Sequence, residues 1–322
     1  MDGELSGSLR RSRSPGRWGV KFSFGVIFIP SLLAPFFLTG CETGGRDPSS
    51  ESSLDSLSAV SSPHSSVLSI LDASGETLVL TTLPRRIVCL VPSGSETLLK
   101  LGAAELLVGR TDFDTLSALS HLPSVGGGLN PNIEALVALE PDLVIRFAGE
   151  SDPSTPGALR QMGIPHLAIR PSSVADVRRI IRDLGDVTAR KDAADSLLDA
   201  MSATLEEVRT RVRERPKTRV GYILGGTPPW VAGPGSYIEE ILEIAGGENV
   251  FSDLETLFGP VNAEVFLIRQ IDLLLASEGA EVSIPESDAP LLRVSPSVEI
   301  PGPNLASAAL ELARVLHPEA FH

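Results

Sequence analysis

Apolar positions follow three different patterns along the chain. Residues 22–38 are almost all apolar and follow a short basic stretch, whereas residues 42–66 are rich in serine, glycine, proline and aspartate. From about residue 67 onward, short continuous apolar runs alternate with segments in which apolar residues recur every three to four positions. This alternation predicts β-strands and amphipathic helices, so the folded part of the chain is expected to begin near residue 67.

The pattern over residues 67–171 predicts strands that alternate with helices. A hairpin is expected over residues 69–83 with its turn at Ser74–Gly75. Ser93 and Glu96 have the spacing of a capping box, and Asn130-Pro131-Asn132 has the form of an N-cap followed by a first-turn proline. The expected strands are 86–91, 106–111, 141–147 and 165–170, with helices after residue 93 and over 133–140. The β–α–β–α order predicts an α/β lobe with a mainly parallel sheet.

Residues 173–214 show helical periodicity and no strand signal. We expect a break near Gly185 and a second helix from about 189 to 214, roughly 39 Å long, ended by Pro216. The α/β pattern then restarts, and Ser236 with Glu239 predicts a capped helix start. The later expected elements are strand 219–224, helices 236–245 and 263–270, strand 272–277, a segment near 291–295 and a helix over 305–316.

Together these elements predict an α/β fold of two lobes, each with a mainly parallel sheet and flanking helices. One long α-helix is expected to join the lobes, with a ligand cleft between them, because clefts between domains commonly bind ligands. The expected divisions are a signal peptide (1–40), a flexible tether (41–66), an N-terminal lobe (67–171), a helical segment with the linking helix (172–216) and a C-terminal lobe (217–322).

The N-terminal segment has the parts of an export signal. Five basic residues precede the apolar run, and Leu38-Thr39-Gly40-Cys41 resembles the bacterial lipobox, in which the cysteine is lipidated. An uncleaved signal anchor is the alternative, although Pro30 and Pro35 interrupt the run. Cleavage before Cys41 removes five basic and two acidic groups, so the net charge falls from −14 to −17. Such an acidic chain would repel nucleic acid. Glu42 favours the outer membrane in double-membrane bacteria.

No constellation of catalytic residues is visible. The chain has no G-x-S-x-G elbow, and its five histidines form no H-x-x-x-H pair. Convergence of His121, His166 and His317 in space would make a metal-ion receptor, and an enzyme on this scaffold is a further alternative. After Cys41, only Cys89 remains, and its apolar run predicts a small core residue. No catalytic site and no covalently bound cofactor are therefore expected.

Aromatic residues are scarce, and several fall where strands meet loops. This position suits a flat or bulky apolar ligand, or equally a plug at the end of a lobe. The residues concerned are Phe113, Phe147, Trp230 and Phe258. Glu134 and Glu264 each follow an asparagine in the first turn of an expected helix. The helix macrodipole explains such acids, and the alternative is that one carboxylate on each lobe engages an arginine of a partner.

Four segments carry a family resemblance. They resemble the vitamin B12-type substrate-binding proteins of ABC transporters, in the class with one linking helix that also handles iron-siderophores and haem. The segments are "RRIVCLVPSGSETLLKLGAAELLVGRTDFD", "VGGGLNPNIEALVALEPDLVI", "VAGPGSYIEEILEIAGGENVF" and "PGPNLASAALELARVLHPEAF". The resemblance implies an exported, lipid-anchored monomer on the periplasmic side. Its implied partners are an ABC permease and the cytoplasmic ATPase of that permease.

The resemblance also implies roles for residues. Glu134 and Glu264 match the glutamates that dock on permease arginines, and the four aromatic residues match those lining the cleft for cobalamin or another corrinoid. Two departures leave an iron-siderophore or haem ligand open: Phe113 lacks a tyrosine hydroxyl, and Gly126-Gly127-Gly128 stands where a tryptophan can occur. For an anionic siderophore, Arg293, Arg146 and Arg170 are candidates, although surface solvation is the simpler expectation for each.

Overall fold

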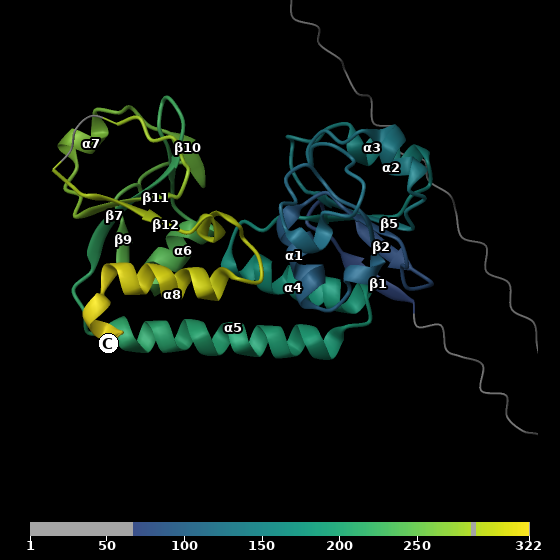
Figure 1. The fold of residues 1–322 in the computed structure, drawn as a ribbon, viewed down its shortest axis with the longest axis horizontal. Helices are drawn as coiled ribbons and strands as arrows, with labels where there is room; N and C mark the ends of the chain where they lie inside the picture. The colour runs from purple at the N-terminus through teal and green to yellow at the C-terminus, as the bar shows by residue number, and fades with distance from the viewer. Residues whose placement is uncertain (1–66, 285–287, 322) are drawn as a thin grey trace, which may run out of the picture. The chain divides into compact units, whose positions relative to one another are not determined.

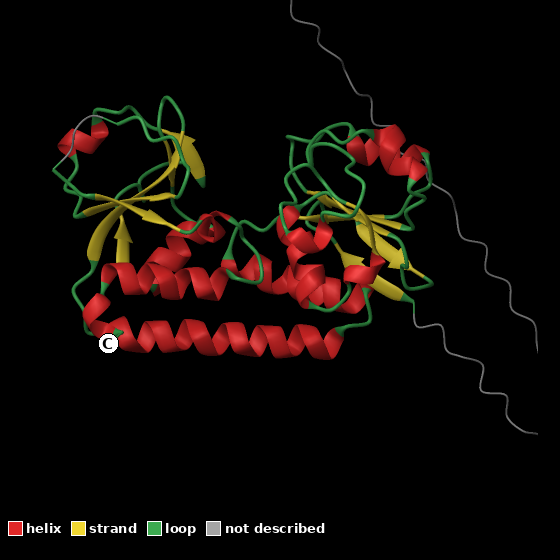
Figure 2. Ribbon diagram, in the orientation of Figure 1, coloured by secondary structure: helices red, strands yellow, loops and turns green. Residues whose placement is uncertain are grey.

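The computed structural model describes residues 67–284 and 288–321, so the expected signal peptide, Cys41 and the tether lie outside the described residues. These residues form two α/β lobes and a group of helices that connects them (Figures 1 and 2). Within the described ranges, no helix combines the length and the apolar character needed to cross a bilayer.

The expected hairpin is present and is attached to the edge of the N-terminal lobe. Strands β1 (Leu68–Leu71) and β2 (Thr77–Leu80) pair antiparallel. The buried Asp72 carboxylate accepts hydrogen bonds from three groups of the turn and from the Ala168 backbone N–H at 3.1 Å. Because the Ala73 N–H also donates to the Ala168 carbonyl, the hairpin covers the edge of the next sheet.

The N-terminal lobe contains a sheet in which every strand pair is parallel, as the β–α order predicted. Its strands, in the order β4-β3-β5-β6, are β3 (Ile87–Cys89), β4 (Leu107–Gly109), β5 (Leu143–Phe147) and β6 (His166–Ile169). Its helices are α1 (Pro92–Lys100), α2 (Ile133–Ala138) and α3 (Thr155–Gln161). The sequence patterns gave no indication of α3, which is under two turns long.

Two predicted helix starts in this lobe are wrong. Helix α1 begins at Pro92, so Ser93 lies inside the helix and no side chain caps it. Glu96 instead accepts a hydrogen bond from the side chain of Asn304, which belongs to the C-terminal lobe. Helix α2 begins later than the Asn130 cap implied, because Asn132 is the N-cap and accepts the Ala135 N–H at 3.0 Å.

Two helices follow, α4 (Val174–Val187) and α5 (Lys191–Val212). The break lies at residues 188–190 and not at Gly185, which is inside α4. A side chain at Gly185 would overlap the Ala194 methyl, so the glycine allows the two helices to approach closely. Helix α5 packs against α4 towards one of its ends and against α8 towards the other, and therefore touches both lobes (Figure 1).

The C-terminal lobe contains a larger, mixed sheet. Strands β9, β7, β11 and β12 pair parallel, and β8 and β10 add an antiparallel edge that the sequence patterns did not reveal. The strands are β7 (Thr218–Gly225), β8 (Trp230–Ala232), β9 (Gly247–Asn249), β10 (Phe258–Pro260), β11 (Leu273–Ser277) and β12 (Leu291–Val294). The helices are α6 (Tyr237–Ile244), α7 (Val265–Ile268) and α8 (Leu305–Leu316).

One apolar core runs from sheet to sheet through the helices. It includes Ile87 and Ile145 of the first sheet, Leu198 of α5 and Val220 of the second sheet. Each sheet also has a smaller core on its opposite face, beneath α2 in the N-terminal lobe and beneath α7 in the C-terminal lobe. The continuous core resists separation of the lobes, because opening it would expose apolar surface to water.

Candidate ligand-binding site

The most apolar of the described pockets lies on the N-terminal lobe, where β3, β4 and β5 end. Its volume is about 630 Å³. None of the ten described residues that line it carries a charge: Leu90, Val91, Pro92, Phe113, Gly127, Gly128, Leu129, Asn130, Phe147 and Ser151. The carboxyl ends of parallel strands are where α/β folds usually bind ligands. The pocket therefore fits an uncharged or apolar face of a ligand.

The glycine run forms one wall of this pocket. Gly126 has a φ of 87°, which favours glycine. A side chain on Gly128 would overlap the carbonyl oxygen of Leu90, whereas a β-carbon on Gly127 would lie no nearer than 3.8 Å to the Asn130 carbonyl oxygen. The chain thus passes directly over the end of β3. The three consecutive glycines are the sequence signal for this part of the site.

A local hydrogen-bonded turn holds Phe113 outward. The buried Asp114 carboxylate accepts the Thr111 N–H and hydroxyl, both at 2.7 Å, and the Thr111 hydroxyl oxygen accepts the Phe113 N–H at 3.2 Å. The Phe113 side chain is consequently 67% exposed. Phe147, at the end of β5, lines the same pocket and also packs against the main core. The structure therefore brings these two predicted residues together.

The other two predicted aromatic residues lie on the antiparallel edge of the C-terminal lobe. Trp230 in β8 is opposite Pro260 in β10, and its side chain is 45% exposed. Phe258 is half-buried, with its ring 5.9 Å from that of Tyr237. Neither residue lines the N-terminal pocket, so their role in ligand binding stays a prediction.

The arginine candidates all bind backbone carbonyls. Arg293 donates to the Ser277 and Ala280 carbonyls at 2.9 and 2.8 Å, which braces the turn after β11. Arg170 donates to the Ala148 carbonyl. Surface solvation was the wrong expectation for Arg146, which is buried and donates to the Phe147 carbonyl at 3.2 Å. A ligand role for Arg293 stays a prediction.

The two acidic candidates occupy matching positions. Glu134 lies in the first turn of α2, and Glu264 is the residue immediately before α7; both are exposed. Helix α7 is shorter than the predicted 263–270 segment. The Asn262 side chain accepts the Glu264 N–H at 3.1 Å, and the Asn132 side chain accepts the Ala135 N–H at 3.0 Å, so an asparagine bonds the backbone beside each acid. Asn132 is the N-cap of α2, whereas the N-cap of α7 is Glu264 itself.

The described histidines do not converge on a metal site. His166 lies 3.7 Å from Glu76 in the N-terminal lobe, whereas His317 lies near Gly246 and Glu319 in the C-terminal lobe. Within residues 67–284 and 288–321, no group of three potential ligands could hold a metal ion. The metal-ion alternative therefore lacks its required site there.

Buried polar groups elsewhere belong to the core. Cys89 is a fully buried free thiol, and loss of hydration raises its pKa to about 12. Burial also raises the pKa of Tyr222 and of Tyr237, whose hydroxyls contact the side chain and the carbonyl of Glu299 at 3.2 and 2.8 Å. An un-ionised thiol or phenol is a poor nucleophile, so these groups are structural.

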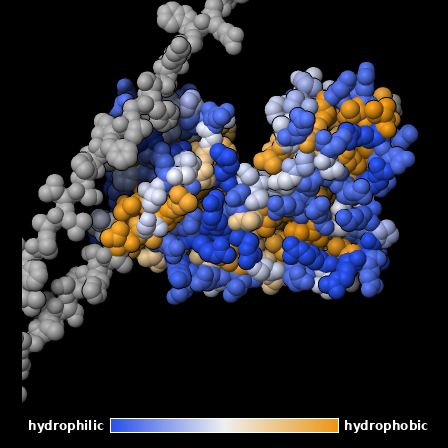
Figure 3. Space-filling model, turned by 180° about the vertical axis from the view of Figure 1, so that it is seen from behind, coloured by the Kyte–Doolittle hydropathy of each residue, from blue (hydrophilic) through white to orange (hydrophobic). Residues whose placement is uncertain are grey.

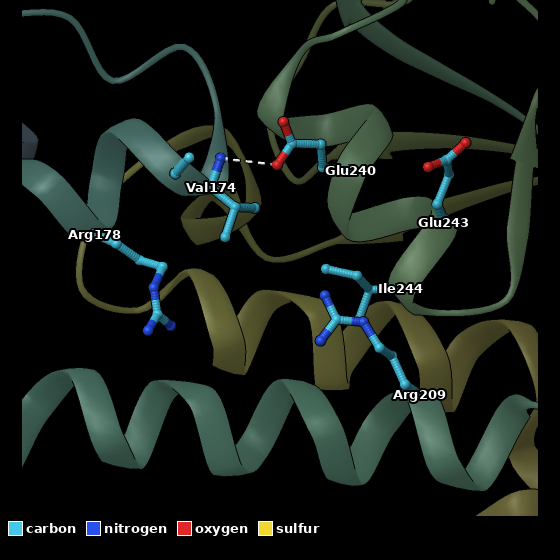
Figure 4. Close-up of a pocket in the computed structure, with 7 residues that line it drawn as sticks. Val174, Arg178, Arg209, Glu240, Glu243 and Ile244 are labelled. Carbon is cyan, nitrogen blue, oxygen red and sulfur yellow. Dashed lines mark hydrogen bonds between the residues drawn. The ribbon is translucent and has the colours of Figure 1, made fainter.

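A second pocket lies where α4, α5 and α6 meet (Figure 4). Its volume is about 510 Å³, and both Arg178 and Arg209 line it together with Glu240 and Glu243. Glu240 accepts the Val174 N–H at 2.9 Å, which ties α6 of the C-terminal lobe to the start of α4. The polar lining and this contact make the second pocket part of the junction between the lobes.

Seen from behind, the surface of the molecule is mainly polar with separate apolar patches (Figure 3).

The chain belongs to the periplasmic binding protein family, whose pattern matches residues 87–289. It is 30% identical over 220 residues to a cobalamin-binding protein of Halobacterium salinarum, covering 65% of this chain and 58% of that protein. It is 24% identical over 314 residues to the uncharacterized ABC transporter substrate-binding lipoprotein YvrC of Bacillus subtilis, covering 92% and 98% of the two chains. The chain thus spans less than two thirds of the length of its Halobacterium relative.

Solved structures share the fold. The vitamin B12-binding protein BtuF of Vibrio cholerae superposes with a TM-score of 0.64 at 23% identity, covering 74% of this chain and 98% of that one. The haem-binding protein RhuT of Roseiflexus gives the same TM-score and identity, covering 73% and 99%. The family to which the chain belongs consists of binding proteins.

Proposed function

We propose that the protein is the lipid-anchored receptor of an ABC transporter and that it captures cobalamin or another corrinoid between its lobes. The uncharged pocket beside Phe113 and Phe147 carries this proposal. A corrin ring has uncharged amide side chains around its edge, so it can lie against such a wall without leaving a buried charge unpaired. The similarity to a protein named as cobalamin-binding supports the same ligand class.

The lining also bears on haem and ferric siderophores. Haem carries two carboxylates and an iron that accepts a protein ligand, and many ferric siderophores are anionic. Among the described residues that line the N-terminal pocket, there is no basic side chain and no histidine, tyrosine, cysteine or methionine. A corrinoid brings its own ligands to cobalt, so it needs neither a protein ligand to the metal nor a basic side chain in this pocket. Haem and siderophores remain the alternative ligands because haem-binding proteins share the fold.

Trp230 provides a direct test. It is the only tryptophan after residue 42, because the other is Trp18. Titration of the chain from residue 42 with cyanocobalamin should quench Trp230 emission saturably, with calorimetry giving a stoichiometry near one. An inner-filter control is needed because the ligand absorbs light. The absence of both quenching and heat would reject cobalamin, and haem and ferric siderophores would then be tested in the same way.

Delivery to the permease is proposed to involve one glutamate on each lobe. Glu134 and Glu264 are exposed at matching positions, which suits two arginines on a permease built from two similar halves. The double variant Glu134→Ala plus Glu264→Ala should lose ligand uptake while keeping ligand affinity. The matched control is Glu206→Ala plus Glu207→Ala on α5, which removes the same charge. Equal uptake by both double variants and wild type would reject docking through these acids.

Anchoring is proposed to occur at Cys41. Lipidation there would hold a monomeric receptor at the outer side of the cytoplasmic membrane, or in the periplasm of a double-membrane cell, with the ATPase on the cytoplasmic side of the permease. The lipoprotein name of the Bacillus relative supports this location. Cys41→Ser should release the protein from the membrane fraction, and retention of the variant in membranes would contradict the anchor.

A further inference from the structure

The two lobes have the same local structure around Glu134 and Glu264, the candidate docking acids. Residues 131–140 and 261–270 have the same order of buried, half-buried and exposed positions at all ten places. Pro131 and Leu136 are the buried residues of the first segment, and Val261 and Phe266 are those of the second. Leu136 and Phe266 each pack into the separate core on the outer face of their own sheet. The acids at 134 and 264 therefore stand on equivalent supports.

In each lobe, an aspartate that follows α2 or α7 bonds to the start of a central strand. Asp142 accepts the Arg86 N–H at 2.9 Å and donates its own N–H to the Arg86 carbonyl at 2.9 Å. Asp272 forms the same pair of bonds with Arg219, at 2.8 and 2.9 Å. The strand registers agree, because Ile87 pairs with Leu143 and Val220 pairs with Leu273. Arg86 and Arg219 are thus equivalent residues.

The side chains of Arg86 and Arg219 extend towards the residues that follow α2 and α7. In the N-terminal lobe, Arg86 donates to the Leu139 carbonyl at 2.6 Å and to the Glu140 carbonyl at 3.0 Å, which satisfies the end of α2. In the C-terminal lobe, Arg219 donates to the Gln270 side chain. Each arginine therefore connects the start of a central strand to the segment that carries a docking acid.

The two supports differ in tightness. The Arg219 Nε is buried and has no hydrogen-bond acceptor among the described residues, and a pocket of about 570 Å³ lies beside it. Helix α7 has 4 residues, whereas α2 has 6. Leu267 and Ile268 are 57% and 79% exposed. Arg269 anchors the end of α7 by pairing with Asp253 and donating to the Val250 carbonyl. The helix itself is a single turn with two exposed apolar residues, and so short a helix has a lower local free energy of opening.

We propose that Arg86 with Asp142, and Arg219 with Asp272, are positioning residues that orient the two docking acids. The N-terminal support holds Glu134 rigidly, and the C-terminal support lets Glu264 adapt to the partner. This inference rests on the proposed docking function. In this proposal the four residues act through α2 and α7 and not by contact with ligand or partner.

Hydrogen exchange of the full chain tests the supports without a permease. In the wild type, amides of 265–268 should exchange faster than those of 133–138. Arg86→Ala should speed exchange in 133–138 by about fivefold, the effect of losing roughly one net hydrogen bond, and Arg86→Lys should give a smaller change. The control is Arg160→Ala, which breaks an exposed ion pair to Glu76 in the same lobe. Unchanged exchange in Arg86→Ala, or equal exchange of the two wild-type segments, would overturn the proposal.

Uptake of labelled cyanocobalamin by native membrane vesicles tests the positioning role. Arg86→Ala should raise the protein concentration needed for half-maximal uptake while its cyanocobalamin affinity stays within about twofold of wild type, because the change is remote from the pocket. A lower melting temperature with unchanged half-maximal concentration would make Arg86 merely structural. If the double glutamate variant behaves as wild type, the docking proposal fails, whereas the exchange results still decide whether the supports hold the helices.

Discussion

Removal of the Phe113 ring should weaken ligand binding and leave folding nearly unchanged. The side chain is 67% exposed in the pocket wall, so it contributes little to the core of the free protein. A phenylalanine side chain can bury roughly 150 Å² or more. If a ligand covers the exposed part, about 100 Å² leaves water. At about 25 cal/mol per Å² that is worth up to about 2.5 kcal/mol.

Only part of this free energy is expected to appear as affinity, because binding also restricts the ring. We therefore expect Phe113→Ala to raise the Kd for cyanocobalamin by about tenfold to sixtyfold. Calorimetry measures this Kd, and Trp230 emission gives a second reading because Trp230 is unchanged. Urea unfolding of the free variant should differ from wild type by less than about 1 kcal/mol.

Met162→Ala is the matched control for this prediction. Met162 is 48% exposed on the same lobe, at the end of α3, and does not line the pocket. It should leave the Kd within about twofold of wild type. If Phe113→Ala and Met162→Ala bind equally tightly, the uncharged pocket is not where the ligand lies. The reasoning from exposed aromatic area would then be refuted.

Three further predictions concern stability and reactivity. Burial raises the pKa of Asp183 to about 6, so folding favours its protonated form, and the free energy of unfolding should fall as pH rises from about 4 to 6. Asp183→Asn should remove this pH dependence and add about 0.5–1 kcal/mol of stability at pH 7 after allowance for solvent screening. Urea unfolding at several pH values tests this, and an unchanged pH dependence in the variant would contradict it. Cys89 should react with a thiol reagent at pH 8 only after unfolding, and prompt reaction of the native chain from residue 42 would show that burial does not protect it. Gly128→Ala should cost about 1–3 kcal/mol in thermal or urea unfolding because its methyl overlaps the Leu90 carbonyl, whereas Gly127→Ala should be tolerated, and equal stability would disprove the close approach.

Much of the fold was predictable from local patterns. The hairpin over β1 and β2, the central strands β3, β5, β7 and β11, and helix α8 all lie where apolar periodicity placed them. The α6 start was also predicted correctly, since Ser236 accepts the Glu239 N–H. These elements are long or strongly patterned, and local propensity and burial agree for them. Short elements such as α3, β8 and β10 carry too few residues to show a period.

Two of the wrong local predictions share one cause. Glu96 has the spacing of a capping residue, yet it accepts a hydrogen bond from Asn304, 208 positions away along the chain. Gly185 is a residue type that often ends helices, yet it lies within α4, where its lack of a side chain lets Ala194 pack against it. In both cases a tertiary contact outweighed the local preference, which amounts to only about 1 kcal/mol.

The sequence by itself determined the α/β class, the two-lobe division by a long helical segment, the binding-protein family and the candidate residues. Hydrophobic periodicity and scarce aromatic residues are properties of the chain alone. Only the tertiary structure decided that Phe113 and Phe147 share an uncharged pocket with the glycine run, and that Arg86 and Arg219 form the same bonds to Asp142 and Asp272. Contacts between residues distant in sequence depend on how strands align and helices pack, and no local pattern records that geometry.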